Sequence, residues 1–281
     1  MDHVKSKPND HNPVHCVSRQ IIFAKGNVDL RDTLHSLKMD GALLWNGINE
    51  ILRSRHPAAV IRLRHETWTR SDALLDADGT VPQTLAKRAL PLGAYPLESQ
   101  FSRAVFDTDA GVIIFSMQPD LNSILVRHRR EGFLFYPSGW QSWTPSDQAW
   151  LREEFTPLPP LDVATSMVNF AAIIARIRTR SNAPILIYNI SSAVPGERVH
   201  AYDGLDEILS TRIRRFNLGL IEVSQQTGIS IIDVDTITAR AGADRVKYDA
   251  LHLTGDGCRV VAEEVVRVLD DLGCLAQGSG L

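Results

Sequence analysis

The stretch AGVIIFSM at residues 110–117 decides the fold class, because it is a short, continuous apolar run. Strands of this kind lie inside parallel sheets, where helices cover both faces. The chain contains four further strand-like runs, namely RQIIFA (19–24), AAVIRLR (58–64), APILIYNI (183–190) and ISIIDVD (229–235). The sequence therefore predicts five strands spread along the chain.

Helical patterns separate these strands. A first helix is expected from Asp29, after the Gly26-Asn27 break, because an acidic residue stabilises the amino end of a helix. Further helices are expected at 146–156, 165–180, 204–226 and 254–273. Since strands alternate with helices and crossovers are right-handed, we predict a three-layer α/β/α sandwich with a central parallel five-stranded sheet, of the flavodoxin-like type.

One domain is expected to hold the whole pattern, over residues 18–275. Residues 1–17 mix Asp, Asn, Pro, His and Lys, and are interpreted as a mobile tail. Residues 276–281 are interpreted as a second, short tail. The stretch near 130–160 is irregular and rich in Trp, Pro and Ser, which indicates an insertion or a cap on the domain.

The composition excludes several classes of protein. With 44% apolar and 22% charged residues the chain is globular, and its formal charge of -3 gives no footprint for nucleic acid. No apolar run reaches the roughly 18–20 residues that span a bilayer. The polar start lacks a signal sequence, and the odd set Cys16, Cys258 and Cys274 suits a reducing compartment. We therefore expect a cytoplasmic protein.

The loops at the carboxyl ends of the strands are where ligands bind in such folds. They are AKGNVDL (24–30), SMQPDLN (116–122), NISSAVPGE (189–197) and DALHL (249–253). Gly26 permits a tight turn from strand to helix, and backbone N–H groups there can hold an anion. The last loop places Asp249 and His252 three residues apart, ahead of an amphipathic helix.

Together these features resemble the SGNH/GDSL hydrolase superfamily. The resemblance covers about Arg19 to Leu269, and its most specific part is VKYDALHLTGDGCRVVAEEVV (246–266), which carries D-x-x-H before the final helix. It implies an esterase or acyltransferase that acts on O-acyl esters of a carbohydrate or small molecule, without a cofactor or metal. His252 would be the general base and Asp249 would orient it.

The first and third blocks of the family depart from its pattern. Val28 stands where the family has its serine nucleophile, and residues 117–120 keep only Asp120 of the family's G-x-N-D. The substrate would lie over Gly26, Asn27, Gln118 and Asp120. For the second block Gly41 and Gly47 are candidates, although neither follows a strand convincingly.

The missing serine leaves several chemical alternatives. Ser116, Ser191 and Ser192 follow strands at the correct edge and could replace it, with Ser116 the first candidate. A water molecule activated by His252 would instead give direct hydrolysis. The chain could also be an inactive SGNH-like domain that binds a glycan, an acyl group or a partner protein.

Each of these features also has a structural interpretation. Asp249 can cap a helix while His252 packs, and Gly26-Asn27 can be a plain turn. Burial is the expected role of Trp140, Trp143 and Trp150, although a cap could stack them on a sugar. The basic run 127–132 is expected to be a solvated helix end rather than a phosphate site. His3, His11, His15 and Cys16 could ligate a metal but lack regular spacing.

Overall fold

The computed structural model describes residues 18–39, 41–193, 195 and 207–275. The predicted tails at 1–17 and 276–281, with the possible metal ligands His3, His11, His15 and Cys16, lie outside these residues. Within the described residues, no helix is both long and apolar enough to cross a bilayer.

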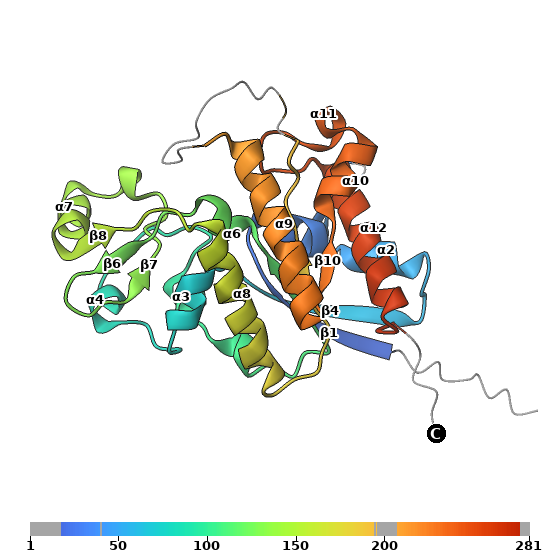
Figure 1. The fold of residues 1–281 in the computed structure, drawn as a ribbon, viewed down its shortest axis with the longest axis horizontal. Coiled ribbons are helices and arrows are strands. Elements are labelled where there is room, and N and C mark those ends of the chain that lie inside the picture. Colours follow the sequence, from blue (N-terminus) through green and yellow to red (C-terminus); the bar gives the residue numbers. More distant parts are fainter. Residues whose placement is uncertain (1–17, 40, 194, 196–206, 276–281) are drawn as a thin grey trace, which may run out of the picture.

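The central sheet has five parallel strands, as the sequence predicts (Figure 1). Their order is β10–β9–β5–β1–β4. The strands are β1 (Ser18–Lys25), β4 (Ala59–Glu66), β5 (Val112–Ser116), β9 (Ile185–Tyr188) and β10 (Ser230–Ile232). All five residues of β5 are buried, because helices cover both of its faces.

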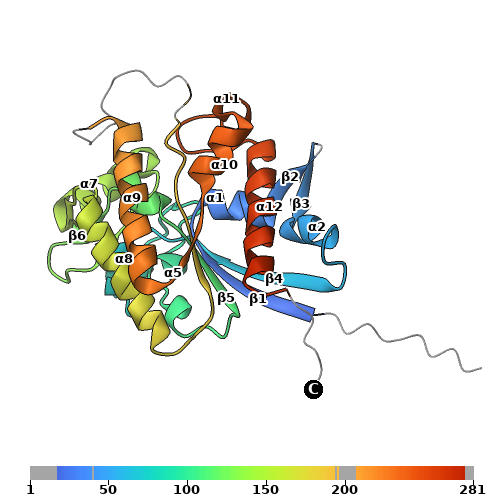
Figure 2. The same ribbon diagram turned by 45° about the vertical axis from the view of Figure 1, so that its right-hand side comes forward.

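Helices form a layer on each face of the sheet, which confirms the three-layer α/β/α sandwich (Figure 2). Successive side chains of a strand point to opposite faces. Ile22 and Ile114 thus pack in a core with α2 (Ile48–Arg53) and α12 (Gly255–Asp271). Phe23, Ile113 and Phe115 pack in a second core with α8 (Val163–Arg178) and α9 (Leu209–Thr227).

The first predicted helix is shorter than the sequence suggested. It consists of α1 (Val28–Leu30) and a π-helical turn (Arg31–His35). The chain then forms an antiparallel hairpin of β2 (Ser36–Met39) and β3 (Ala42–Trp45). The fifth strand also ends earlier than predicted, because Asp233 accepts the N–H of Thr236 and starts α10 (Val234–Ala241).

A second, smaller sheet occupies the region that the sequence marked as irregular. Its order is β7–β6–β8, with β6 (Val126–His128), β7 (Leu134–Phe135) and β8 (Phe155–Pro157) all antiparallel to their neighbours. Helix α7 (Pro145–Glu154), predicted at 146–156, packs beside it. Trp143 is buried in a separate apolar core there, as expected, while Trp140 and Trp150 are partly buried.

Short helical segments complete the chain. They are α3 (Ser71–Asp76), α4 (Gln83–Ala86), α5 (Leu97–Gln100), α6 (Gln118–Asn122), α11 (Ala243–Val246) and two 3-10 turns, Ala104–Phe106 and Trp140–Ser142. Four of them, α3, α4, α5 and the turn Ala104–Phe106, lie between β4 and β5, and α6 leads from β5 to the small sheet (Figure 1).

Candidate active site

The carboxyl edge of the central sheet brings four loops together, as the parallel order requires. A small cavity lies between them, with walls from the bend after β1, the loops after β5 and β9, and the segment before α12. Its lining includes Asp29, Gln118, Tyr188, Ser191, Lys247 and Leu251. This edge holds the residues that the sequence singled out.

Asp249 and His252 contact each other at this edge. The Nδ1 atom of His252 lies 2.9 Å from Oδ2 and 3.0 Å from Oδ1 of Asp249. The His252 side chain is 49% exposed, and its Nε2 atom has no hydrogen-bond partner among the described residues. The imidazole is therefore oriented from one side and open on the other.

The Asp249 carboxylate is fixed in a tight turn of its own. Its Oδ1 atom accepts the backbone N–H groups of Leu251 and His252, each at 2.9 Å. Partial burial alone would raise the pKa of Asp249, but these hydrogen bonds and the imidazole hold the pKa below its usual value. The acid is thus kept as a carboxylate, the form that can orient and stabilise an imidazolium.

Buried contacts anchor the loop that carries the pair. The ammonium of Lys247 donates to the carbonyl of Ala250 at 2.9 Å and to carbonyls of Ser191 and Ala193 in the loop after β9. The Gln118 side-chain amide lies 3.5 Å from the carbonyl of Leu251. The His252 loop therefore sits directly beside the loops after β5 and β9.

The bend after β1 requires glycine at position 26. A Cβ atom there would lie 2.4 Å from Cδ1 of Leu30 and 3.1 Å from Cβ of Ser116, closer than packing permits. Asn27 follows as a buried residue, and its side-chain amide makes no hydrogen bond within the described part of the chain. Val28 comes next and offers no nucleophilic atom.

Asp29 is a site residue that the sequence analysis treated only as a helix start. Its Oδ1 atom accepts the backbone N–H of Asn27 at 3.2 Å, and its Oδ2 atom accepts the hydroxyl of Ser116. Burial raises the pKa of Asp29, and the Ser116 hydrogen bond opposes this effect. No motif marks this carboxyl, because only the fold brings it against β5.

The architecture can be compared with known structures once this geometry is established. No protein-family model and no curated protein matches the sequence. A lipolytic G-D-S-L family protein from Veillonella parvula is similar in structure, with 12% identity, a TM-score of 0.44 and coverage of 90% of this chain and 98% of that chain. The acetylxylan esterase Axe2 from Geobacillus stearothermophilus has 9% identity, a TM-score of 0.48 and coverage of 90% and 95%.

An acetyl xylan esterase, AlAXEase, gives a similar result, with 10% identity, a TM-score of 0.49 and coverage of 89% of this chain and 99% of that chain. This chain is similar in fold to GDSL proteins. The five parallel strands and the position of the D-x-x-H loop before α12 are those that the sequence predicted. Function must be argued from the residues of this chain.

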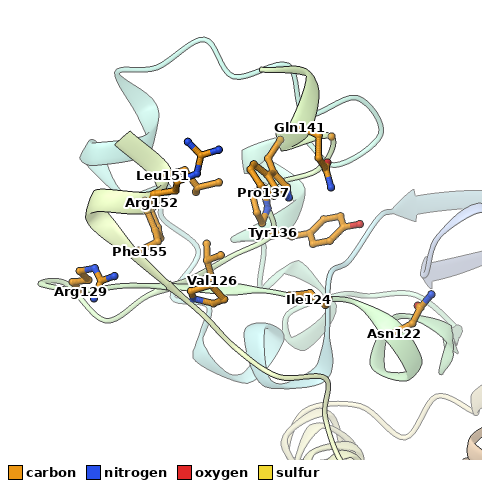
Figure 3. Close-up of a pocket in the computed structure, with 13 residues that line it drawn as sticks. Asn122, Ile124, Val126, Arg129, Tyr136, Pro137, Gln141, Leu151, Arg152 and Phe155 are labelled. Atoms are coloured by element: carbon orange, nitrogen blue, oxygen red, sulfur yellow. The ribbon is translucent and has the colours of Figure 1, made fainter. Parts of the chain in front are cut away.

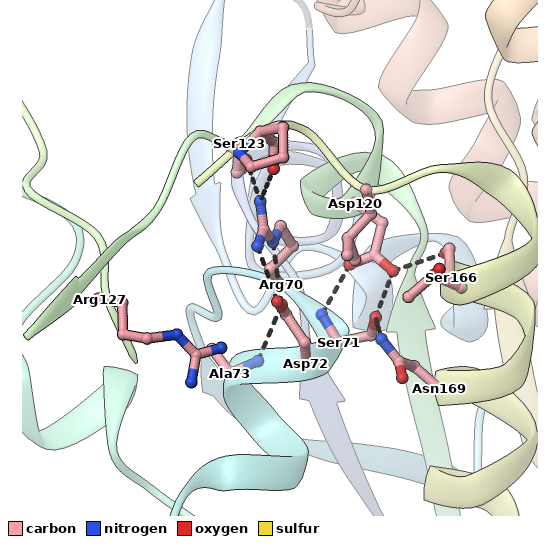
Figure 4. A network of polar contacts seen from close by, with 12 residues as sticks. Arg70, Ser71, Asp72, Ala73, Asp120, Ser123, Arg127, Ser166 and Asn169 are labelled. Carbon is pink, nitrogen blue, oxygen red and sulfur yellow. Dashed lines mark hydrogen bonds and ion pairs between the residues drawn. The ribbon is translucent and has the colours of Figure 1, made fainter. Parts of the chain in front are cut away.

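Asp120, the one residue retained from the third SGNH block, lies away from the substrate edge. It is fully buried, and its oxygens accept the N–H and hydroxyl of Ser71 and the hydroxyl of Ser166 at 2.5–2.7 Å (Figure 4). Burial raises its pKa to about 6. The expected oxyanion or substrate role therefore does not fit, because every contact of Asp120 is structural.

The serines proposed as substitutes for the SGNH nucleophile are also engaged. Ser116 is fully buried, donates to Asp29 and accepts the N–H of Gln118 at 3.0 Å. Ser191 is buried against the hydroxyl of Thr238 at 2.6 Å. Ser192 is partly buried, and its backbone N–H donates to Asp235. The hydroxyls of Ser116 and Ser191 are thus buried and hydrogen-bonded, while Ser192 is only partly buried.

The second SGNH block has no counterpart at the predicted glycines. Gly41 lies in the turn of the β2–β3 hairpin with a φ of 79°, and Gly47 follows that hairpin. His65 instead occupies the end of β4, where its Nε2 atom lies 3.0 Å from the carbonyl of Gly26. Burial lowers the pKa of His65 to about 4, so a neutral imidazole supports the bend at neutral pH.

Proposed function

We propose that the chain hydrolyses O-acyl esters of a small molecule or carbohydrate, with His252 as general base and Asp249 as its orienting partner. The contact between Asp249 and His252 Nδ1, with Nε2 open at the carboxyl edge, is the observation that carries the proposal. The resemblance of the sequence to SGNH proteins favours the same class of enzyme. Its three cysteines form no disulfide framework, which favours the cytoplasm as its location.

Water is the nucleophile that fits the site best. Val28 replaces the SGNH serine, and the hydroxyl of Ser116 is buried against Asp29. In the proposed reaction His252 Nε2 takes a proton from water while the water oxygen bonds to the acyl carbon. The tetrahedral intermediate then expels the alcohol oxygen, which receives that proton back from the imidazolium. Asp249 stabilises the imidazolium throughout.

Two side-chain amides are candidates to stabilise the oxyanion. The amide of Asn27 has no hydrogen bond among the described residues, and the amide of Gln118 makes one long contact with Leu251. Each could donate an N–H to the developing charge. Such a donor contributes about 3 kcal/mol to transition-state stabilisation in enzymes of this chemistry. In Asn27→Ala, the loss of transition-state stabilisation is therefore expected to exceed the loss in free energy of unfolding.

The same site supports a second candidate, a binding domain without turnover. Val28 at the nucleophile position favours it, since this side chain cannot attack a carbonyl carbon. Such a site would bind the carbonyl of a glycan acetyl group, an acyl group or a partner protein. An acyltransferase would use the first mechanism, with an acceptor alcohol in place of water.

The decisive experiment compares turnover of para-nitrophenyl acetate and acetylated xylosides by wild type and His252→Ala. Loss of the general base is expected to lower kcat/KM by roughly 100-fold or more. His56→Ala is the matched control. His56 also contacts an aspartate, Asp270, at 3.3 Å, but it precedes the amino end of β4, whereas the candidate site lies at the carboxyl ends of the strands. Equal turnover by His252→Ala and wild type would refute the mechanism.

Further measurements separate the remaining alternatives. If water is the nucleophile, mass spectrometry of quenched reactions finds no acetylated protein, and a sulfonyl fluoride that modifies catalytic serines does not inhibit. Ser116→Ala then retains turnover within about tenfold, since that hydroxyl is buried against Asp29 and the N–H of Gln118 and takes no part in the reaction. A folded protein that binds the acetylated xylosides and turns over none of the esters would favour the binding domain.

A further inference from the structure

A larger pocket lies between the sandwich and the small sheet. It has a volume of about 560 Å³, within the roughly 300–1,000 Å³ typical of small-molecule sites. Figure 3 shows Val126 and Phe155 at its centre and Pro137 and Gln141 above them. Most of the wall is apolar or aromatic, with contributions from Ile124 and other residues of the second sheet.

Two arginines give this pocket a positive end. Arg129 and Arg152 both lie on the left of Figure 3, Arg152 above Arg129, and no carboxylate of the described residues lines the pocket. Arg129 donates to the carbonyl of Glu153 at 2.9 Å, and Arg152 donates to the amide oxygen of Gln148 at 3.2 Å. Neither guanidinium pairs with a carboxylate among the described residues, so both retain N–H donors for an anion.

The other end of the pocket approaches the candidate active site. Helix α6 begins at Gln118, beside Asp29, and ends at Asn122, which lines the pocket. These positions are about 6 Å apart along a helix axis. Tyr136, also in the wall, packs edge-to-face on Tyr95 with ring centroids 4.8 Å apart.

We infer that this pocket binds a small molecule with a ring-sized apolar body and one anionic group, the anion at Arg129 and Arg152. If the proposed function holds, the group bound in this pocket is the non-reacting part of the ester substrate. The scissile ester bond would then extend from it past Tyr136 toward Gln118. The apolar wall does not suit a strongly hydrated sugar at the centre of the pocket. The indole of Trp140, 5.6 Å below the Arg152 guanidinium, completes a surface for a flat ring.

Fluorescence titration with anilinonaphthalene sulfonate tests the pocket without any need for turnover. Phenylnaphthylamine, the same rings without the sulfonate, is the neutral control probe. Arg129→Ala and Arg152→Ala are each expected to weaken sulfonate binding roughly threefold and to leave the neutral probe within about twofold. Arg130→Ala is the matched control, because Arg130 is exposed next to Arg129 and does not line this pocket.

A second pair of variants tests the apolar part. Ile124→Trp places an indole in the pocket and is expected to weaken both probes roughly tenfold. Ile221→Trp is its control, because Ile221 is 46% exposed on α9 and Ile124 is 43% exposed. His252→Ala is expected to bind both probes as wild type does, which separates this inference from the proposed reaction.

The inference is overturned by either of two results. In the first, Arg129→Ala and Arg130→Ala bind the sulfonate probe equally, which would show that the positive charge of Arg129 does not contribute to binding the anion. In the second, sedimentation shows a wild-type dimer that Ile124→Trp dissociates, so a second copy of the chain fills the pocket. If esters are turned over, an anionic para-nitrophenyl adipate should be preferred over the neutral hexanoate by wild type and less so by Arg129→Ala.

Discussion

At the scale of single residues, the buried carboxyl of Asp120 joins three segments that are distant in sequence. It accepts from Ser71, which begins α3, and from Ser166 in α8, while Asn169 donates to the Ser71 hydroxyl at 3.0 Å (Figure 4). A charge in this site loses its hydration, and only hydroxyl and N–H donors replace water. The pKa of Asp120 is consequently raised to about 6.

This raised pKa predicts how stability depends on pH. Between about pH 4 and pH 6 the folded protein binds a proton at Asp120 that the unfolded chain has released, so stability falls as pH rises through that range, by about 3 kcal/mol at most. Asp120→Asn keeps the size and removes the titrating group, with an amide NH2 that donates to the serine hydroxyls where the carboxylate accepted from them. The fall in stability between about pH 4 and pH 6 is expected to be absent from this variant. Urea unfolding at several pH values measures it, and equal pH profiles for both proteins would contradict the assignment.

Gly26 allows a second prediction at this scale. Gly26→Ala would force a methyl group against the side chain of Leu30, only 2.4 Å away, and against Ser116. We expect a loss of about 2 kcal/mol in unfolding free energy, together with lower esterase activity, because the bend must shift. Urea unfolding and ester turnover of Gly26→Ala measure the two effects, and wild-type values for both would contradict this packing.

The sequence predicted only the part of the site whose residues are close together along the chain. Contacts between distant segments depend on the fold and were not predicted. The Asp249–His252 contact could be predicted because the two residues lie only three positions apart in one loop. Asp120 was assigned to the substrate edge on a matching letter, because the sequence does not show that Ser71 and Ser166 approach it from 49 and 46 residues away. Asp29 was missed for the same reason, since its partner Ser116 is 87 residues distant.

At the scale of elements, the helix α12 fixes the loop that carries His252. Thr254 caps this helix: its hydroxyl oxygen accepts the N–H of Gly257 at 3.2 Å and donates to the carbonyl of Arg245 at 3.2 Å. Thr254→Ala removes both contacts and is expected to cost about 1 kcal/mol of unfolding free energy. Thr254→Ser retains the hydroxyl and should unfold at nearly the wild-type urea concentration. Equal losses in the two variants would show that the methyl group matters instead.

Elements were predictable where their pattern was long or fully apolar. The strand β5 and the helices α8 and α12 were found because buried residues recur along each of them. The β2–β3 hairpin was missed, since β3 exposes Leu43 and Trp45 and so lacks an alternating pattern. The strands of the small sheet have two or three residues each, which is too short for any periodicity.

At the scale of the whole molecule, two buried arginines join the small sheet to the sandwich. The chain leaves the sandwich near Ser123 and returns near Pro159. Arg70, 1% exposed, donates to the carbonyls of both, at 3.1 and 2.9 Å, and its guanidinium is held by Asp72 (Figure 4). Arg212, on α9, contacts the carbonyls of Leu121 and Leu161 in the same way. The planar guanidinium spans both segments at once.

This arrangement predicts that the small sheet can be loosened without unfolding the sandwich. Arg70→Lys keeps the charge but offers an ammonium that cannot hold Asp72 and both carbonyls in one geometry, so about 2 kcal/mol should be lost locally. Backbone amides of β6 and β8 are then expected to exchange hydrogen faster, while those of β1 and β5 stay protected, because the sandwich has its own cores. Arg215→Lys, on an exposed side chain of α9, is the control and should leave both sheets unchanged. Uniformly faster exchange in Arg70→Lys would mean that the two sheets unfold as one unit, and the pocket between them would then be as rigid as the sandwich itself.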